Sequence, residues 1–166
     1  MRLREIERAD LDEVAQLHTD IWKIAYRGMV PDTALDALEW THRRDLFAPW
    51  FDDPMGTWLV AIDDDGAVTG HVLAAPVPAP DFVESGEAET RHGELLLLYV
   101  APDQWGTGLG AELLAAGERI LRRHGCDTAE LWTFESNERS QRFYNRHGGQ
   151  ALLSLDKTCH VTRTCW

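Results

Sequence analysis

The sequence predicts one α/β domain of the α+β type, built around a mixed sheet. A chain of 166 residues suits a single compact domain over residues 1–166. Segments with the helical apolar period and segments with the strand period follow one another in the order α α β β β α β α β β. Because a strand pair comes early and a strand–helix–strand unit comes later, we expect both antiparallel and parallel pairing.

Two helices are expected near the N-terminus. The chain starts extended and enters a helix near Asp10, and Gly28 and Pro31 stop this helix. Asp32 is the predicted N-cap of a second helix that continues to about Phe47.

A hairpin and a buried strand come next. Strands are expected at 57–62 and 68–75, joined by the acidic turn 63–66. The segment 76–92 is rich in Pro, Gly and acidic residues, so we expect a long, mobile loop. The run 94–100 (ELLLLYV) is nearly all apolar, which is typical of a strand buried on both faces.

A glycine-rich segment, 105–111, then runs directly into a helix for which Gly125 is the end signal. The remaining elements are expected to be a strand at 128–134, a helix from Ser136 or Asn137 to about His147, and closing strands at 152–155 and 159–164.

Composition narrows the function classes. Sixteen basic and 28 acidic side chains give a net charge of −12, which disfavours binding to nucleic acids and to anionic membranes and weakly favours a cationic substrate. The N-terminus has no apolar signal segment, and three cysteines without CxxC spacing indicate free thiols, so a cytoplasmic protein is expected. No Cys or His spacing predicts a metal site.

The glycine-rich segment carries the clearest chemical signal. Gly106, Gly108 and Gly110 lie between a strand and a helix, so their N–H groups would be available at a positive helix end. Such a loop suits a phosphate or pyrophosphate; a tight structural turn is the alternative. A dinucleotide-binding fold would need more chain after Gly110, and a Walker A loop would need a lysine.

Two motifs point to a family. The segment 98–110 (LYVAPDQWGTGLG) resembles the strand and pyrophosphate loop of the GNAT superfamily of acetyl-CoA-dependent N-acyltransferases, with Trp105 where Arg or Gln is usual. The segment 131–144 (LWTFESNERSQRFY) resembles the family's Asn-x-x-Ala/Ser-x-x-Phe-Tyr motif, although Gly149 stands where Phe is usual. The segment 22–31 is also similar to a stretch found in many bacterial members.

The resemblance implies a fold and an activity. It implies a mixed, mostly antiparallel sheet of six to seven strands, splayed in the middle and flanked by about four helices. It also implies transfer of an acetyl group from acetyl-CoA to a primary amine of a small molecule or peptide, by direct attack in a ternary complex and without a metal. A CoA-binding sensor and an NAD(P)-dependent oxidoreductase are the alternatives. A homodimer could form through the closing strand pair.

The resemblance also assigns roles to residues. Tyr144 is the candidate general acid, and Glu94 and Glu135 are rival candidates for the general base. Trp22 and Tyr26 are candidate walls of the acceptor pocket. Core packing is the alternative for the aromatic residues, and solvent exposure is the alternative for the two acids. The candidate cofactor contacts are Leu98, Tyr99, Val100, Trp105, Gly106, Thr107, Gly108, Leu109, Gly110, Ala111, Asn137, Ser140, Phe143 and Tyr144.

Overall fold

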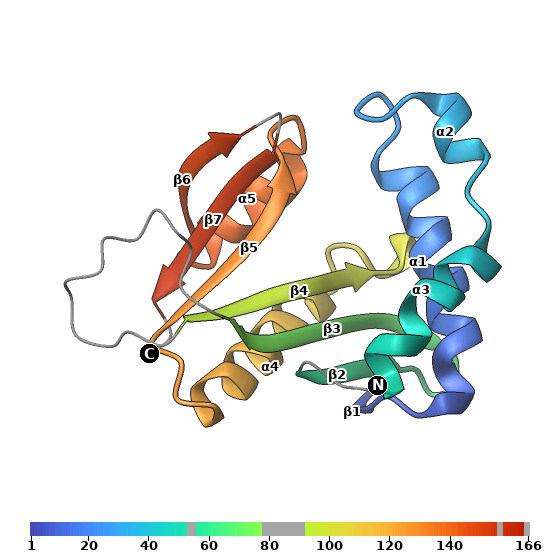
Figure 1. Ribbon diagram of the computed structural model, residues 1–166, viewed down its shortest axis with the longest axis horizontal. Helices are drawn as coiled ribbons and strands as arrows, with labels where there is room; N and C mark the ends of the chain where they lie inside the picture. The colour runs from blue at the N-terminus through green and yellow to red at the C-terminus, as the bar shows by residue number, and fades with distance from the viewer. Residues whose placement is uncertain (53–55, 78–91, 156–157, 165–166) are drawn as a thin grey trace. The chain divides into compact units, whose positions relative to one another are not determined.

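The computed structural model describes residues 1–52, 56–77, 92–155 and 158–164, with side chains as far as Gln150. Seven strands form one sheet in the order β1-β2-β3-β4-β5-β7-β6 (Figure 1). The pair β4–β5 is parallel, whereas β1–β2, β5–β7 and β6–β7 are antiparallel, so the expected mixed sheet is confirmed. The described residues form five α-helices, one more than the four or so expected.

The chain divides into two compact units, and β3, β4 and α4 run from one into the other. The first unit holds residues 1–73 and 97–114, and the second holds residues 74–96 and 115–166. The elements of the first unit are β1 (Arg2–Glu5), the 3₁₀ turn Arg8–Asp10, α1 (Leu11–Ala25), α2 (Asp32–Asp36), α3 (Trp40–Asp52), β2 (Thr57–Ile62), most of β3 (Val68–Val77), the end of β4 (His92–Val100), the 3₁₀ turn Pro102–Gln104 and the start of α4 (Leu109–Arg123).

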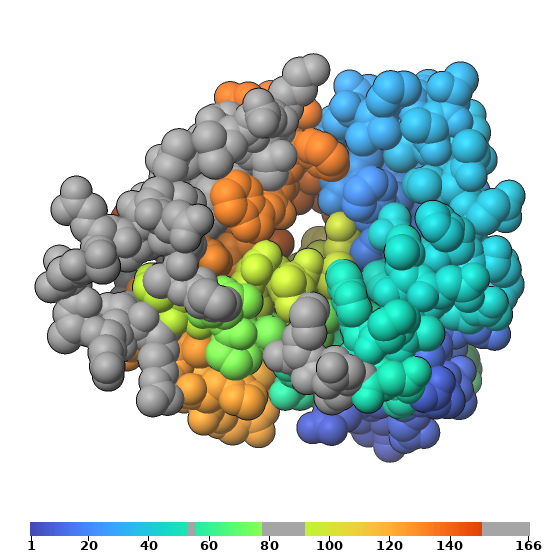
Figure 2. All heavy atoms as spheres, viewed as in Figure 1, coloured from blue at the N-terminus to red at the C-terminus, as the bar shows by residue number. Residues whose placement is uncertain are grey.

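Two neighbouring residues of β3 show how the first unit is layered. A Cβ atom on Gly70 would lie 2.9 Å from Leu113 Cδ1, so α4 packs directly on this face of the strand. The next residue, His71, points to the opposite face, where it is fully buried beside side chains of α1 and α3. The helix α3 lies at the surface beside α1 (Figure 2).

The predicted second helix is wrong in two respects. Residues 32–47 do not form one helix, because α2 ends at Asp36 and α3 begins at Trp40. Leu35 is fully buried, and the N–H of Leu38 bonds back to the carbonyl of Leu35, so the chain turns at this point. Asp32 is not the N-cap: Pro31 occupies that position, and the Asp32 carboxylate lies 3.3 Å from the guanidinium of Arg27.

The second unit is built on the other half of the sheet. Thr128–Phe134 of β5 pairs along its whole length with Thr158–Thr164 of β7, and β6 is the outer strand. A Cβ atom on Gly93 would lie 2.5 Å from Leu121, so this glycine allows α4 to approach β4. The elements are the end of β3, the start of β4, the end of α4, β5 (Thr128–Phe134), α5 (Glu138–Arg146), β6 (Gln150–Leu155) and β7 (Thr158–Thr164).

The strand β4 departs from the sequence prediction. It was expected to be buried on both faces, but burial alternates: Leu95 and Leu97 are buried, whereas Leu96 and Leu98 are half-exposed. Its register with β5 covers only residues 92–94 among the described residues of both strands. Most of the expected loop 76–92 lies outside the described residues.

Candidate functional site

The glycine-rich segment forms an open loop at the N-terminus of the 15-residue helix α4. Gly106 and Gly108 have φ angles of +83° and +103°, which side-chain-bearing residues rarely adopt. A Cβ atom on either glycine would meet no atom of the described residues within 4 Å, apart from those of its chain neighbours. Within the described chain, no group accepts a hydrogen bond from the N–H of Gly106, Gly108 or Gly110. The loop therefore presents three donors beside the positive end of a helix, and this arrangement fits an anionic group.

Hydrogen bonds from side chains to backbone carbonyls stabilise this loop. The indole Nε1 of Trp105 donates to the carbonyl of Val100 at 2.8 Å, and the hydroxyl of Thr107 donates to the carbonyl of Gln104 at 2.8 Å. The N–H of Ala101 bonds to the carbonyl of Thr69 on β3. Trp105 thus ties the loop to the end of β4, a contact that the sequence motif did not predict.

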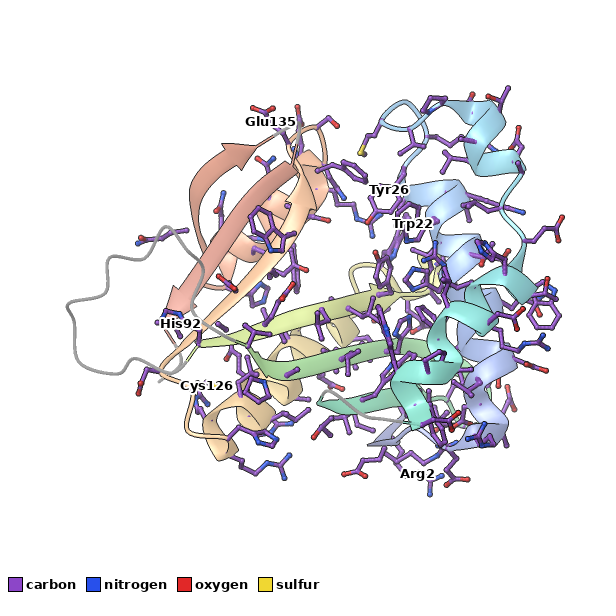
Figure 3. All side chains as sticks on the ribbon, in the orientation of Figure 1. Arg2, Trp22, Tyr26, His92, Cys126 and Glu135 are labelled. Carbon is purple, nitrogen blue, oxygen red and sulfur yellow. The ribbon has the colours of Figure 1, made fainter. Side chains whose placement is uncertain are left out.

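An aromatic cluster lies beside the same end of β4. The hydroxyl of Tyr99 accepts a hydrogen bond from Trp22 Nε1 at 3.1 Å and lies 3.4 Å from the hydroxyl of Tyr26. Trp22 and Tyr26 project from α1 one turn apart, with ring centres 4.7 Å apart (Figure 3). Burial raises the pKa of Tyr99. The structure therefore brings the predicted acceptor-side residues Trp22 and Tyr26 against the predicted cofactor strand.

Two buried histidines lie under this cluster. Trp58 Nε1 donates to His71 Nδ1 at 3.3 Å, and because an indole can only donate, the proton of neutral His71 is on Nε2. His71 Nε2 then donates to His18 Nδ1 at 3.3 Å, which leaves the His18 proton on Nε2. That N–H is buried and has no partner in the described chain. Burial lowers the pKa of His71 to about 3 and that of His18 further still.

The sequence motifs do not include His71 or Arg43. His71 lies in the middle of a strand of mostly small and apolar residues, and this position is the sequence feature that could have indicated a buried histidine. Arg43 lies on α3 with its guanidinium carbon 5.1 Å from the ring centre of Trp22 and 5.8 Å from that of Phe47. It is half-buried, and this burial lowers its pKa.

The two candidate bases are far apart within the second unit. Glu94 of β4 is in register with Glu130 of β5, and Glu135 lies five residues further along, roughly 17 Å at the usual rise of a strand. Glu94 is half-buried, and burial together with the Glu130 carboxylate raises its pKa. Glu135 is exposed at the end of β5 (Figure 3). The two glutamates cannot serve the same proton transfer.

The second predicted motif lies on α5. Asn137 is the N-cap, since its side chain accepts from the N–H of Ser140 at 3.1 Å, which decides between the two predicted caps. Tyr144 is buried, with its ring 5.1 Å from that of the half-buried Phe143. Ser140 and Tyr144 lie one turn apart on the same side of the helix.

The predicted site residues thus fall into two groups. The first unit contains the loop 105–111, residues 98–100, Trp22 and Tyr26, and the second contains Glu94, Glu135 and the α5 residues. Within the described ranges, no group of three or more His, Cys, Asp or Glu side chains could hold a metal ion. In the same ranges, every helix is too short or too polar to cross a membrane.

Comparison with known proteins identifies the family. Residues 12–149 match the acetyltransferase (GNAT) family, a stretch that includes both motifs. The chain belongs to the acetyltransferase (GNAT) family.

Relatives of this GNAT chain carry acetyltransferase names. It is 28% identical over 135 residues to the uncharacterized N-acetyltransferase YuaI of Bacillus subtilis, and the match covers 81% of this chain and 72% of that protein. It is 39% identical over 99 residues to a mycothiol acetyltransferase of Stackebrandtia nassauensis, but that match covers 60% of this chain and only 29% of the relative.

Solved structures agree on the fold. The PaiA N-acetyltransferase of Thermoplasma acidophilum, in complex with coenzyme A, has a TM-score of 0.79 at 17% identity and covers 98% of both chains. The protein yncA of Salmonella typhimurium, with its cofactor acetyl-CoA, has a TM-score of 0.69 at 18% identity and covers 100% of this chain and 94% of that one. The predicted GNAT fold is therefore confirmed.

Proposed function

We propose that this GNAT protein transfers the acetyl group of acetyl-CoA to a primary amine of a small molecule or peptide, by direct attack in a ternary complex. The observation that carries the proposal is the loop at the start of α4, where three N–H groups have no partner in the described chain. Family membership supplies the reaction class. CoA-bound structures of the same fold support the choice of cosubstrate.

The loop suits the pyrophosphate of acetyl-CoA. Backbone donors at a helix N-terminus bind phosphates without a basic side chain, which matters in a chain of net charge −12. Gly106 and Gly108 adopt the positive φ angles of this loop, and a Cβ atom on either would meet no described residue within 4 Å apart from its chain neighbours, which leaves room for a ligand beside them. We assign Trp105 and Thr107 to bracing this loop, with Leu109, Gly110 and Ala111 as the first turn of the helix beneath the pyrophosphate.

The transfer needs three further groups. The amine nitrogen attacks the thioester carbonyl, and the backbone of residues 98–100 is proposed to bind the pantetheine arm and polarise that carbonyl. As the C–S bond breaks, Tyr144 is proposed to give its proton to the leaving sulfur. Glu94 is proposed to accept the proton of the amine through water, because its raised pKa suits a base near neutral pH better than an exposed carboxylate would. Asn137, Ser140 and Phe143 are proposed to support the cofactor arm.

Calorimetric titration with acetyl-CoA tests the first part of the proposal. We expect saturable binding by wild type and at least about tenfold weaker binding by Gly108→Ala, because a Cβ atom disfavours the required φ of +103°. Gly66→Ala is the matched control, since Gly66 also has a positive φ but lies in the β2–β3 turn. The proposal is wrong if millimolar acetyl-CoA does not bind, and a protein that binds acetyl-CoA without releasing thiol would be a sensor.

A further inference from the structure

Arg43 is a half-buried cation that has no carboxylate partner among the described residues. Its guanidinium lies over the rings of Trp22 and Phe47, and no carboxylate of the described chain lies within ion-pair distance of it. Taking a guanidinium out of water is unfavourable unless a charged or hydrogen-bonding partner compensates. The rings compensate in part through cation–π attraction. The arrangement therefore leaves the in-plane N–H donors of Arg43 to another acceptor.

Neighbouring arginines show the usual arrangement. Arg44, the next residue on α3, has its guanidinium within 4 Å of carboxylates, and so does Arg27, which follows α1. The carboxylates involved are Asp12 and Asp45 for Arg44, and Asp32 and Asp36 for Arg27. These four carboxylates are thus paired with arginines other than Arg43.

A second donor lies beside the same two rings. The His18 ring stacks on Trp22 at 6.0 Å and meets Phe47 edge-on at 5.1 Å. Its Nε2–H is buried and has no acceptor among the described residues, and burial, His71 and the charge of Arg43 together lower the pKa of His18. The cluster therefore combines a guanidinium and an imidazole N–H, both donors, and a negative group would complement both.

We propose that Arg43 binds a carboxylate of the acceptor, so that the acceptor is an amine that also carries a carboxylate, such as an amino acid. This inference rests on the proposed function. Tyr99 links the proposed thioester site to Arg43. Its neighbours on β4 are assigned to the thioester, and its hydroxyl accepts a hydrogen bond from Trp22, over whose ring Arg43 lies. The planar fork of a guanidinium matches a carboxylate with two parallel hydrogen bonds.

The net charge of the chain predicts a cationic acceptor, and Arg43 adds a negative group to that prediction. The net charge of −12 still favours the ammonium end of the acceptor. Arg43 adds a local preference for a negative group at the other end. In an acceptor with both charges, the ammonium group is attracted by the net negative charge of the chain and the carboxylate pairs with Arg43.

The test compares matched pairs of amines by thiol release from acetyl-CoA. One series pairs alanine, leucine and phenylalanine with their amides, and another pairs straight-chain ω-amino acids of increasing length with alkylamines of the same length. The amides have less basic amines, which react more readily at neutral pH, so a preference for the acids would arise despite that bias. We expect kcat/KM to favour the acids by about tenfold or more in at least one series.

Variants then assign the preference to Arg43. Arg43→Met keeps an unbranched apolar side chain against the rings but removes the charge and the fork, so it should raise KM for the acids and leave KM for the partners without a carboxylate unchanged. Arg43→Lys should restore part of the preference, because it restores the charge alone. Arg44→Met is the matched control and should keep the wild-type ratio. Melting temperatures show whether each variant is folded.

The outcomes separate the two proposals. If wild type uses the acids and their partners without a carboxylate equally well, the proposed role of Arg43 is overturned and the proposed acetyltransferase activity is not affected. Weaker acetyl-CoA binding by Arg43→Met also overturns it, because Arg43 would then serve the cosubstrate. If no amine gives thiol release, the proposed function fails. The anion site is then judged by calorimetric titration with the same acids, which must bind wild type and not Arg43→Met.

Discussion

The buried histidine pair makes the stability of the fold depend on pH in a way that can be calculated. His18 is 1% exposed and His71 is fully buried, and burial lowers the pKa of both side chains, that of His71 to about 3. In the unfolded chain each has an ordinary pKa of about 6.5. The unfolded state therefore binds more protons than the folded state below that value, and acid favours unfolding.

The size of the effect follows from the two pKa values. The contribution is complete above the unfolded pKa and is lost as the pH falls from there toward the folded pKa. A histidine that stays neutral in the folded state loses about 2 kcal/mol of stability between about pH 7.5 and about pH 5. The pair together loses about 4 kcal/mol, a large share of the 5–15 kcal/mol typical of a domain.

Urea unfolding at a series of pH values measures this loss. Wild type should lose about 4 kcal/mol more stability over the range than a chain in which both histidines are replaced. His71→Asn keeps an acceptor for Trp58 Nε1 and should reduce the pH-dependent loss by about 2 kcal/mol, whatever its own stability at neutral pH. His124→Asn changes an exposed histidine and is the control. A His71→Asn profile parallel to that of wild type would refute the neutral, buried pair.

Three further predictions follow from the site and the packing. Tyr144→Phe should lower kcat about 100-fold while the calorimetric Kd for acetyl-CoA changes little, as expected for a general acid; an unchanged kcat would remove Tyr144 from that role. Gly108→Ala should weaken acetyl-CoA binding at least about tenfold with a small loss of stability, and full binding would show that the loop N–H groups are not the contacts. Gly70→Ala should destabilise the protein by about 1–3 kcal/mol in urea titrations, because its Cβ would lie 2.9 Å from Leu113 Cδ1 of α4 and 2.9 Å from the Tyr99 carbonyl oxygen of β4; no loss would contradict the close packing of α4 and β4 against this position of β3.

Local signals made the loop predictable from sequence. Glycines between a strand and a helix predict positive φ angles and free N–H groups, and the structure has both at Gly106 and Gly108. The cap at Asn137 was predictable for the same reason, since a cap depends on residues three apart. The indole of Trp105 also acts locally, but nothing in the motif indicated that it would bond to Val100.

Contacts between distant segments were not predictable. The cluster around Tyr99 joins α1, α3 and β4, and whether Arg43 of α3 points into it depends on where the chain breaks between α2 and α3. The break occurs at the turn that follows the buried Leu35, whereas the apolar periodicity of the sequence continues across this turn and predicts one helix. The distance between Glu94 and Glu135 likewise follows only from the register of β4 with β5.

Acetyl transfer itself is tested most directly by measuring free CoA and N-acetylated product together, from acetyl-CoA and a panel of amines that includes amino acids. The proposed function predicts that both products form in a one-to-one ratio with at least one amine, and at a rate that Tyr144→Phe lowers. Binding of acetyl-CoA with no product from any amine, or CoA release without an acetylated amine, would contradict it.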